Sequence, residues 1–345
     1  MSSAAALPAS LPWHTKQWRS ITNALQQQRL HHALLLQGPA GVGKLFFAQR
    51  AAAMLLCEAT ISVDQLPCGE CRSCVLVRAG NHPDRLELTP KEDRSVIDVE
   101  QVRTRISELS LTPHYAGRRV IVVNPADGLN RSASNSLLKT LEEPPGAVVF
   151  LLLSANPGLL PATIRSRCSS IRFQAPQRDQ GAHWLLEQGF TDADAVKAAL
   201  NWNGDAPLAA QRSLQSGEVT RCQELVCSIA AVVDGSVDTV HAAASWRTDG
   251  LHRVVTWQLR VATQAMRIKA LGGVSADSVA MQVISSKLDL TQLDGICEEL
   301  LELQSALERQ LNPSDQLSLE GLAVTWRDAA LKVAKTTKES HRGSA

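Results

Sequence analysis

Aromatic side chains and long apolar runs are both scarce in this sequence. Aromatic residues make up 4% of its 345 residues, and tyrosine occurs once, which favours Ala/Leu-rich helices over β-sandwiches. The longest apolar run, residues 147–153, is far shorter than the roughly 20 residues of a membrane-spanning helix. The first 11 residues lack the basic segment and apolar core of a secretory signal. We therefore expect a cytoplasmic protein that has no membrane partner.

An excess of charge of either sign is also missing. The sequence has 35 basic and 34 acidic residues, for a net charge of +1. Proteins that bind nucleic acid without sequence specificity depend on a basic surplus that neutralises phosphates. Any contact of this chain with DNA should thus be local or shared with partners. With 44% hydrophobic residues, the chain is long enough for two or three domains with cores of their own.

Apolar runs of strand length alternate with stretches of helical periodicity in the first half of the chain. Turn residues such as Gly38 and Pro39 end these runs, as they end buried strands. The expected strands are residues 33–36, 85–89, 119–124, 148–154 and 169–173, and the expected helices are residues 18–30, 44–56, 99–109, 132–141 and the stretch around Thr163. This alternation predicts a parallel sheet that helices cover on both faces.

The pattern changes after Pro176, where only helical runs follow up to about residue 335. Candidate breaks lie at residues 174–176 and 213–218. We therefore predict an α/β domain at residues 1–174, a small helical domain at 175–214 and a larger helical domain at 215–337. Residues 338–345 are polar, and we expect a disordered tail there.

A glycine-rich loop follows the first expected strand. Gly38, Gly41, Gly43 and Lys44 have the spacing G-x-x-G-x-G-K between a strand and a helix, which is the context that a phosphate-binding P-loop requires. The backbone N–H groups of such a loop point at phosphate oxygens, and its lysine reaches the outer phosphates. The alternative is a glycine-rich turn with an incidental lysine.

The metal-binding residues of an ATPase are missing around this loop. Leu45 stands where a serine or threonine hydroxyl would ligate Mg²⁺. The strand expected at residues 119–123 ends in Asn124 and Pro125, where acidic residues would hold the metal and activate water. Asp127, two residues further, is the alternative acidic residue. We predict that the site hydrolyses no ATP, and the sequence leaves open whether it still holds ATP or ADP.

Four cysteines have the spacing of metal ligands. Cys68, Cys71 and Cys74 form C-x-x-C-x-x-C, and Cys57 lies eleven positions before Cys68. Because cytoplasmic thiols stay reduced, this pattern favours a tetrahedral Zn²⁺ site, and four thiolates leave no open position for a catalytic water. We therefore predict a structural zinc; the alternatives are an iron–sulfur cluster and a dithiol redox pair. The other four cysteines are scattered, and we expect core packing for them.

Three segments resemble bacterial clamp-loader subunits, which are AAA+ proteins. Residues 134–145 are similar to the helix and turn that follow the Walker B strand in that family, and residues 164–168 (Ile-Arg-Ser-Arg-Cys) to its Ser-Arg-Cys motif. The cysteine cluster after the P-loop helix is likewise similar. The resemblance covers residues 30–173. It implies an AAA+ domain with an inserted zinc module at about residues 57–74, followed by a helical lid domain and a collar domain that oligomerises.

Differences from the family's motor subunits indicate which class of clamp-loader subunit this chain resembles. The motors, gamma and tau, keep a hydroxyl residue after the lysine, an Asp-Glu pair at Walker B and a nucleotide-sensing arginine in the lid. This sequence has none of these, and residues 204–207 read Gly-Asp-Ala-Pro at the lid position. Delta subunits usually lack the zinc cysteines and the Ser-Arg-Cys motif. The departures therefore point to the delta-prime class.

The resemblance also implies a role for one arginine. In the family, the arginine of the Ser-Arg-Cys motif projects toward the nucleotide of the neighbouring subunit, and Arg167 has that position. The expected function is a non-hydrolysing subunit of the DNA polymerase III clamp loader, which works with gamma/tau and delta subunits in a ring to load the beta sliding clamp onto primed DNA. Without the motif, Arg167 would be a surface ion-pair residue.

Two other functions remain open from the residues. An active AAA+ motor would require that Leu45 and the Asn124-Pro125 pair be tolerated in a working ATPase site. A zinc-dependent DNA-binding module would keep the P-loop only as a vestige, and the net charge of +1 speaks against it.

Overall fold

The computed structural model describes residues 10–59, 67–91, 94, 96–109, 113–115, 117–271, 278–308, 311 and 313–342. The chain divides into two compact units between residues 212 and 213. The division falls where α9 (Pro207–Gln215) runs from the first unit into the second.

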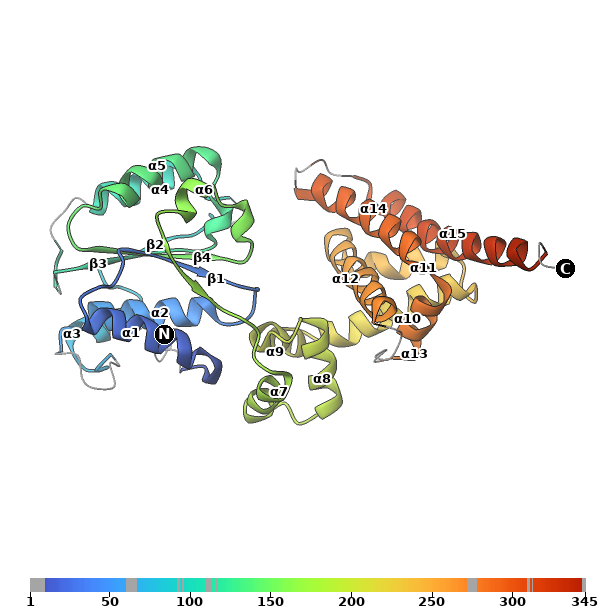
Figure 1. Ribbon diagram of the computed structural model, residues 1–345, viewed down its shortest axis with the longest axis horizontal. Coiled ribbons are helices and arrows are strands. Elements are labelled where there is room, and N and C mark those ends of the chain that lie inside the picture. The colour runs from blue at the N-terminus through green and yellow to red at the C-terminus, as the bar shows by residue number, and fades with distance from the viewer. Residues whose placement is uncertain are drawn as a thin grey trace. The chain divides into compact units, whose positions relative to one another are not determined.

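The first unit contains a sheet of five parallel strands (Figure 1), as the alternating pattern predicted. The strand order is β2-β3-β4-β1-β5, and β1 pairs with β4 through Ala33 and Phe150 and with β5 through Leu34 and Ser169. All five strands lie within one residue of their expected bounds. They are β1 (Ala33–Gln37), β2 (Arg85–Leu88), β3 (Arg119–Val123), β4 (Val148–Ser154) and β5 (Ser169–Arg172).

Helices cover both faces of this sheet, because successive residues of a buried strand point to opposite sides. Leu34 and Leu36 belong to one core cluster, and Ala33 and Leu35 to the other. Figure 1 shows one layer of helices on each side of the strands. The layer on the Leu34 side contains α1 (Thr15–Gln26), α2 (Lys44–Leu56) and α3 (Arg72–Arg78), and the other contains α4 (Val99–Leu109), α5 (Arg131–Glu142) and α6 (Ala162–Arg165).

A short helical segment follows β5 within the first unit. Its α7 (Arg178–Glu187) packs on α8 (Ala193–Trp202), and Leu185 and Leu200 are fully buried there. The side chain of Asp192 caps the first turn of α8 by accepting from the N–H groups of Asp194 and Ala195. The segment ends in α9, which returns to the glycine-rich loop.

The second unit is entirely helical in the part of the chain that the structure describes. Three fully buried tryptophans lie in its core, and each indole N–H has a partner: Trp246 donates to Ser228, Trp257 to Glu218 and Trp326 to Gln258. An indole N–H that is buried without a partner costs free energy, so these bonds stabilise the core. The helices are α10 (Glu218–Asp234), α11 (Thr239–Trp246), α12 (Leu251–Ala270), α13 (Val279–Lys287), α14 (Leu290–Glu308) and α15 (Asp315–Arg342).

Helix α15 extends to Arg342, into the residues where a disordered tail is expected. Residues 343–345 lie outside the described part, so the tail remains a prediction. Lysine, glutamate and arginine are good helix formers, so a polar composition does not by itself end a helix that already has a packed first half.

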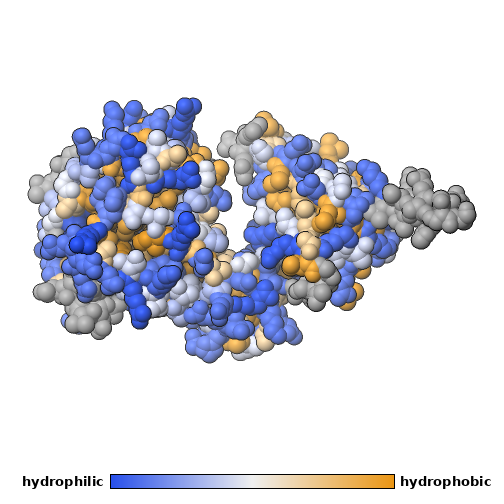
Figure 2. Space-filling model, in the orientation of Figure 1, coloured by the Kyte–Doolittle hydropathy of each residue, from blue (hydrophilic) through white to orange (hydrophobic). Residues whose placement is uncertain are grey.

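No helix among the described residues combines the length and the apolar character that a bilayer crossing requires. On the face seen in Figure 2, hydrophilic residues cover most of each unit and hydrophobic ones are interspersed among them.

Candidate nucleotide, metal and arginine sites

The glycine-rich loop lies between β1 and α2 and packs against α9. The carbonyl oxygen of Gly41 accepts a hydrogen bond from the backbone N–H of Leu208 at 3.0 Å. Gly41 has a φ of +79°, and a Cβ at this position would lie 2.4 Å from the Cβ of Ala209. Only glycine fits this contact. The glycine is therefore needed for the close packing of α9, whether or not the loop binds a phosphate.

Lys44 turns its ammonium group onto its own loop. Its Nζ donates to the carbonyl oxygens of Gly38 at 2.6 Å and Pro39 at 2.7 Å. Burial lowers the pKa of Lys44, and the negative charge of Asp127 opposes that shift. The side chain that would reach an outer phosphate is therefore already held by two backbone oxygens.

The segment before α1 closes the other side of the loop. The carbonyl oxygen of Val42 accepts from Trp13 Nε1 at 2.9 Å and lies 2.8 Å from His14 Nε2. Because a carbonyl can only accept, His14 carries its proton on Nε2, and burial lowers its pKa to about 4. Trp13 also packs edge-on against Trp184 of α7, with ring centroids 5.5 Å apart. Sequence reasoning missed these residues because no motif surrounds them.

A cleft of about 550 Å³ lies beside the loop. Leu45 lines the cleft, and its side chain has no oxygen that could ligate a metal. Pro125 follows β3 at the position where an ATPase has its acidic pair. Arg212 of α9 also lines the cleft. The sequence motifs do not indicate it, because it lies five residues beyond the Gly-Asp-Ala-Pro segment at residues 204–207. The apolar lining residues are Ala40, Leu45, Phe46, Pro125, Leu153, Ala155 and Leu208.

Asp127, the alternative acidic residue, has a structural partner. Its Oδ2 accepts from the backbone N–H groups of Ala155 at 3.3 Å and Asn156 at 3.1 Å, directly after β4. Its Oδ1 is buried and has no hydrogen-bond partner among the described atoms. The carboxylate thus joins the turn after β3 to the turn after β4.

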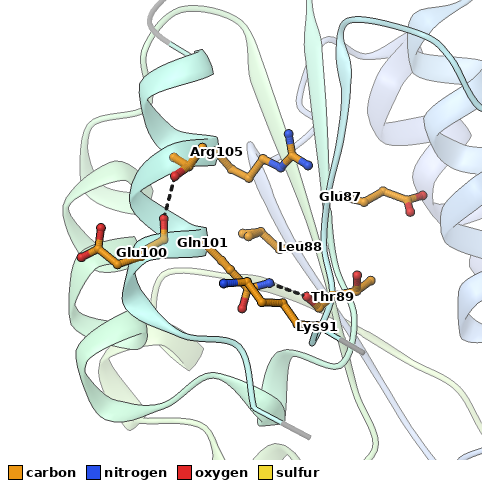
Figure 3. Close-up of a pocket in the computed structure, with 8 residues that line it drawn as sticks. Glu87, Leu88, Thr89, Lys91, Glu100, Gln101 and Arg105 are labelled. Atoms are coloured by element: carbon orange, nitrogen blue, oxygen red, sulfur yellow. Dashed lines mark hydrogen bonds between the residues drawn. The ribbon is translucent and has the colours of Figure 1, made fainter. Parts of the chain in front are cut away.

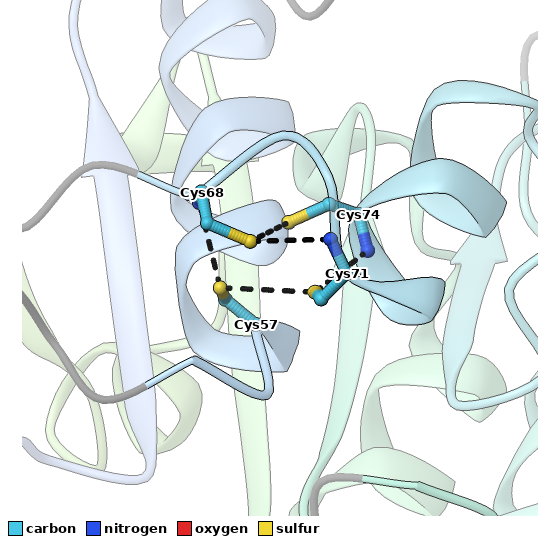
Figure 4. Close-up of side chains that lie close together, drawn as sticks. All are labelled: Cys57, Cys68, Cys71 and Cys74. Atoms are coloured by element: carbon cyan, nitrogen blue, oxygen red, sulfur yellow. Dashed lines mark hydrogen bonds between the residues drawn. The ribbon is translucent and has the colours of Figure 1, made fainter.

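The four predicted metal ligands lie together, as Figure 4 shows. All four Sγ atoms of Cys57, Cys68, Cys71 and Cys74 lie within 4.8 Å of one another. The Cys57–Cys71 and Cys68–Cys74 sulfur pairs are each 3.9 Å apart, close to the roughly 3.8 Å edge of a tetrahedron with Zn–S bonds of about 2.3 Å. Residues 60–66, between the first two ligands, lie outside the described part.

Backbone N–H groups point at three of these sulfurs. Cys57 Sγ accepts from the N–H of Cys68 at 3.5 Å, Cys68 Sγ from Cys71 at 3.3 Å and Cys71 Sγ from Cys74 at 3.4 Å. The N–H of Cys71 lowers the pKa of Cys68 to about 6, whereas burial raises the pKa of Cys57 and of Cys74. Such donors stabilise thiolates and fit the charge of a metal-bound set.

A second contact holds the cluster closed beside the sulfurs. Glu58 Oε1 accepts from the backbone N–H of Ser73 at 2.9 Å and from its hydroxyl at 2.7 Å. Ser73 is fully buried. The contact joins the residue after Cys57 to the residue before Cys74, so it brings the two halves of the ligand set together.

Arg167 lies in the turn between α6 and β5, and its side chain is 36% exposed. Its Nη1 donates to the carbonyl oxygen of Thr163 at 3.0 Å, and its Nη2 lies 2.5 Å from Glu142 Oε1. Among the described contacts, no hydrogen bond or ion pair joins Arg167 to the glycine-rich loop of its own chain. The guanidinium is partly exposed at the surface of the α/β part, where Glu142 and Thr163 bind it.

A second hollow of about 370 Å³ lies between β2 and α4 (Figure 3). Gln101 Nε2 closes one side by donating to Thr89 O at 2.8 Å. The charged residues that line this hollow are of both signs: Glu87, Lys91, Glu100 and Arg105. They do not form a set of ligands for one ion.

Sequence comparisons match this chain to replication proteins. The family model described as "DNA polymerase III, delta subunit" matches residues 13–177. The chain is 31% identical over 322 residues to DNA polymerase III subunit delta′ of Pseudomonas aeruginosa, which covers 91% of this chain and 96% of that protein. It is 34% identical over 220 residues to subunit delta′ of Escherichia coli, covering 64% of this chain and 65% of that protein.

Solved structures of related proteins align less closely. A DNA polymerase III gamma subunit-related protein from Thermotoga maritima aligns with 90% of this chain and 98% of its own, at a TM-score of 0.42 and 16% identity. The clamp-loader delta protein of Bacillus subtilis aligns with 90% of this chain and 99% of its own, at 0.33 and 12%. The sequence relatives are more similar to this chain than these structures are.

Proposed function

Because the chain belongs to the family of DNA polymerase III delta-prime subunits, and is therefore a clamp-loader subunit of that polymerase, we propose that it hydrolyses no ATP itself and supplies Arg167 to the ATP site of a neighbouring subunit. The neighbours are gamma/tau and delta subunits of a cytoplasmic complex. That complex loads the beta sliding clamp onto primed DNA. The observation that carries the proposal is the partly exposed position of Arg167, which has no described contact with its own glycine-rich loop.

The chemistry of arginine suits this role. A guanidinium stays charged at every physiological pH, and its planar fork of N–H groups matches two phosphate oxygens at once. Placed near a transferring phosphoryl group, it stabilises the charge that develops in the transition state. The short α6 and β5 hold the backbone on either side of Arg167. The guanidinium can therefore move only by rotation of its side chain.

The absence of hydrolysis is proposed from three features of the site. Leu45 offers no hydroxyl to a metal, Asn124 and Pro125 stand where acidic residues would hold the metal and activate water, and Asp127 accepts from two backbone N–H groups. Phosphoryl transfer requires a metal, a lysine on the phosphates and an activated water in the same site. An active motor is the less favoured function for this reason.

A structural zinc ion is the second part of the proposal. Cys57, Cys68, Cys71 and Cys74 would hold it as thiolates, and the N–H groups that point at their sulfurs support that charge state. The ion would cross-link the end of α2 to the start of α3. With four protein ligands it would take part in no reaction step.

We also propose a division of the helical part of the chain into two domains. We assign residues 175–214 to a lid, because α9 contacts the glycine-rich loop through Leu208. We assign residues 215–337 to a collar that packs against other subunits. Leu317, Val324 and Leu331 of α15 are 45–70% exposed, and their seven-residue spacing puts them on one face of the helix, as helix–helix packing between subunits requires.

The test uses the assembled complex. Wild-type, Arg167→Ala and Arg167→Lys chains are each combined with the gamma/tau and delta subunits, and DNA- and clamp-stimulated ATP turnover and clamp loading are measured after assembly is confirmed by gel filtration. Arg167→Ala should lower turnover by about 10³- to 10⁵-fold at a site that depends on this finger. The loss for the whole complex is smaller where other subunits supply fingers. Lysine should rescue poorly, and equal activity of all three chains would refute the finger role.

A further inference from the structure

Glu142 is the last residue of α5 and faces Arg167 in the turn after α6. Its Oε1 lies 2.5 Å from Arg167 Nη2, while Thr163 O accepts from Nη1 at 3.0 Å. These two partners come from different helices. Together they hold the two outer nitrogens of the guanidinium fork, so they restrict both the direction and the rotation of its plane.

The backbones that carry this pair are fixed relative to each other. Leu137 and Leu141 of α5 and Ile164 of α6 are fully buried in one core cluster. The freedom of the pair is therefore confined to its two side chains, which are 49% exposed at Glu142 and 36% at Arg167. An arginine without such a partner samples many rotamers in solvent.

We propose that Glu142 is a positioning residue that holds Arg167 in the orientation a neighbouring subunit's phosphates require. The inference rests on the proposed function of Arg167 as an arginine finger. These contacts leave donors of the guanidinium free. It has five N–H donors, and the contacts to Glu142, Thr163 and Ser166 use at most three of them. The remaining donors can bind phosphate oxygens while the pair stays intact.

The expected effect is small because the pair is exposed. Ion pairs of this kind change an equilibrium by about two- to fivefold, and the fraction of correctly oriented arginine sets the rate of the neighbouring site. Glu142→Ala should therefore lower turnover at the neighbouring site about two- to fivefold, and the kcat of the complex by at most that factor. The KM for ATP should stay unchanged, since the neighbour's own P-loop binds the nucleotide.

The experiment is a double-mutant cycle in the assembled complex. ATP turnover is measured against ATP concentration for wild type, Glu142→Ala, Glu142→Gln, Arg167→Ala and the Glu142→Ala/Arg167→Ala pair. Glu142→Gln should retain most of the activity because its amide oxygen still accepts from Nη2. The matched control is Glu143→Ala, which removes the adjacent exposed carboxylate and should leave kcat unchanged. In the Arg167→Ala background, Glu142→Ala should have no further effect.

Each result decides between the two proposals. If Arg167→Ala lowers turnover and Glu142→Ala does not, the positioning role is refuted and the finger stands. A Glu142→Ala loss of equal size in both backgrounds, or failure of that variant to assemble, would assign Glu142 to the fold and overturn the inference. Faster turnover with Glu142→Ala would mean that the pair restrains the finger, which also overturns it. Unchanged turnover with Arg167→Ala would instead refute the proposed function itself.

Discussion

The backbone N–H of Leu208 in α9 donates to the carbonyl oxygen of Gly41 at 3.0 Å. This bond ties the helical segment after β5 to the loop that would hold a phosphate. With Trp13 and His14 bonded to Val42 from the other side, the loop is enclosed by its own chain.

Gly41→Ala should destabilise the first unit more than a glycine substitution without a clash. Gly146 has a similar φ of +70° but nothing within 4 Å of an added Cβ, so Gly146→Ala isolates the backbone cost of about 1 kcal/mol. Gly41→Ala adds the overlap with Ala209, which should cost about 1–3 kcal/mol more. Urea unfolding of both variants measures the difference, and equal losses would show that α9 moves away at no cost.

The isolated chain should show no ATP turnover above background. Leu45→Thr alone should not create activity, because Asn124 and Pro125 still stand where an ATPase has its acidic pair. Phosphate release by wild type, Leu45→Thr and Lys44→Ala measures this. Steady turnover that disappears in Lys44→Ala would contradict it. Weak binding of nucleotide without turnover would not, since the backbone N–H groups of the loop are still present.

His14 should make the stability of the first unit depend on pH. Burial lowers its pKa in the folded chain from 6.5 to about 4, so the unfolded chain binds more protons between these values. The stabilisation is fully present above pH 6.5 and is lost as pH falls toward 4, by on the order of 3 kcal/mol. His14→Gln should flatten this slope relative to wild type in urea unfolding at pH 7, 5 and 4. Slopes that coincide in the two proteins would exclude a role for His14.

Purified chain should contain one zinc ion, and Cys71→Ser should lose it. The change should loosen the segment around α3 while the sheet stays folded, because the two core clusters do not depend on the sulfurs. Elemental analysis measures the metal, and thiol labelling measures the access to the four cysteines. Protein without stoichiometric zinc, or with iron in its place, would refute the prediction.

Glu58 should strengthen that site without being a ligand. Glu58→Ala removes both contacts to Ser73, and outer partners of metal ligands typically change metal affinity about 10- to 100-fold. Competition with a chelator measures the affinity. Glu70→Ala is the matched control, since it removes an exposed carboxylate between two of the cysteines. Equal zinc affinity in the two variants would leave Glu58 without this role.

The sequence by itself determined the elements and motifs that depend on near neighbours. Strand bounds followed from apolar runs that end in turn residues, and the sheet agrees with them within one residue. The cysteine spacing brought four sulfurs together because two-residue spacers at the start of a helix let ligands converge.

Only the tertiary structure decided which distant residues meet at each site. Trp13 and His14 reach Val42 across 28 or 29 positions, Leu208 reaches Gly41, and Glu142 reaches Arg167 across two helices. No periodicity links such positions, because packing of helices on a sheet, and not spacing along the chain, brings them together. The direction of Lys44 belongs to the same class: its residue type predicted a phosphate ligand, whereas the folded loop offers it two carbonyl oxygens first.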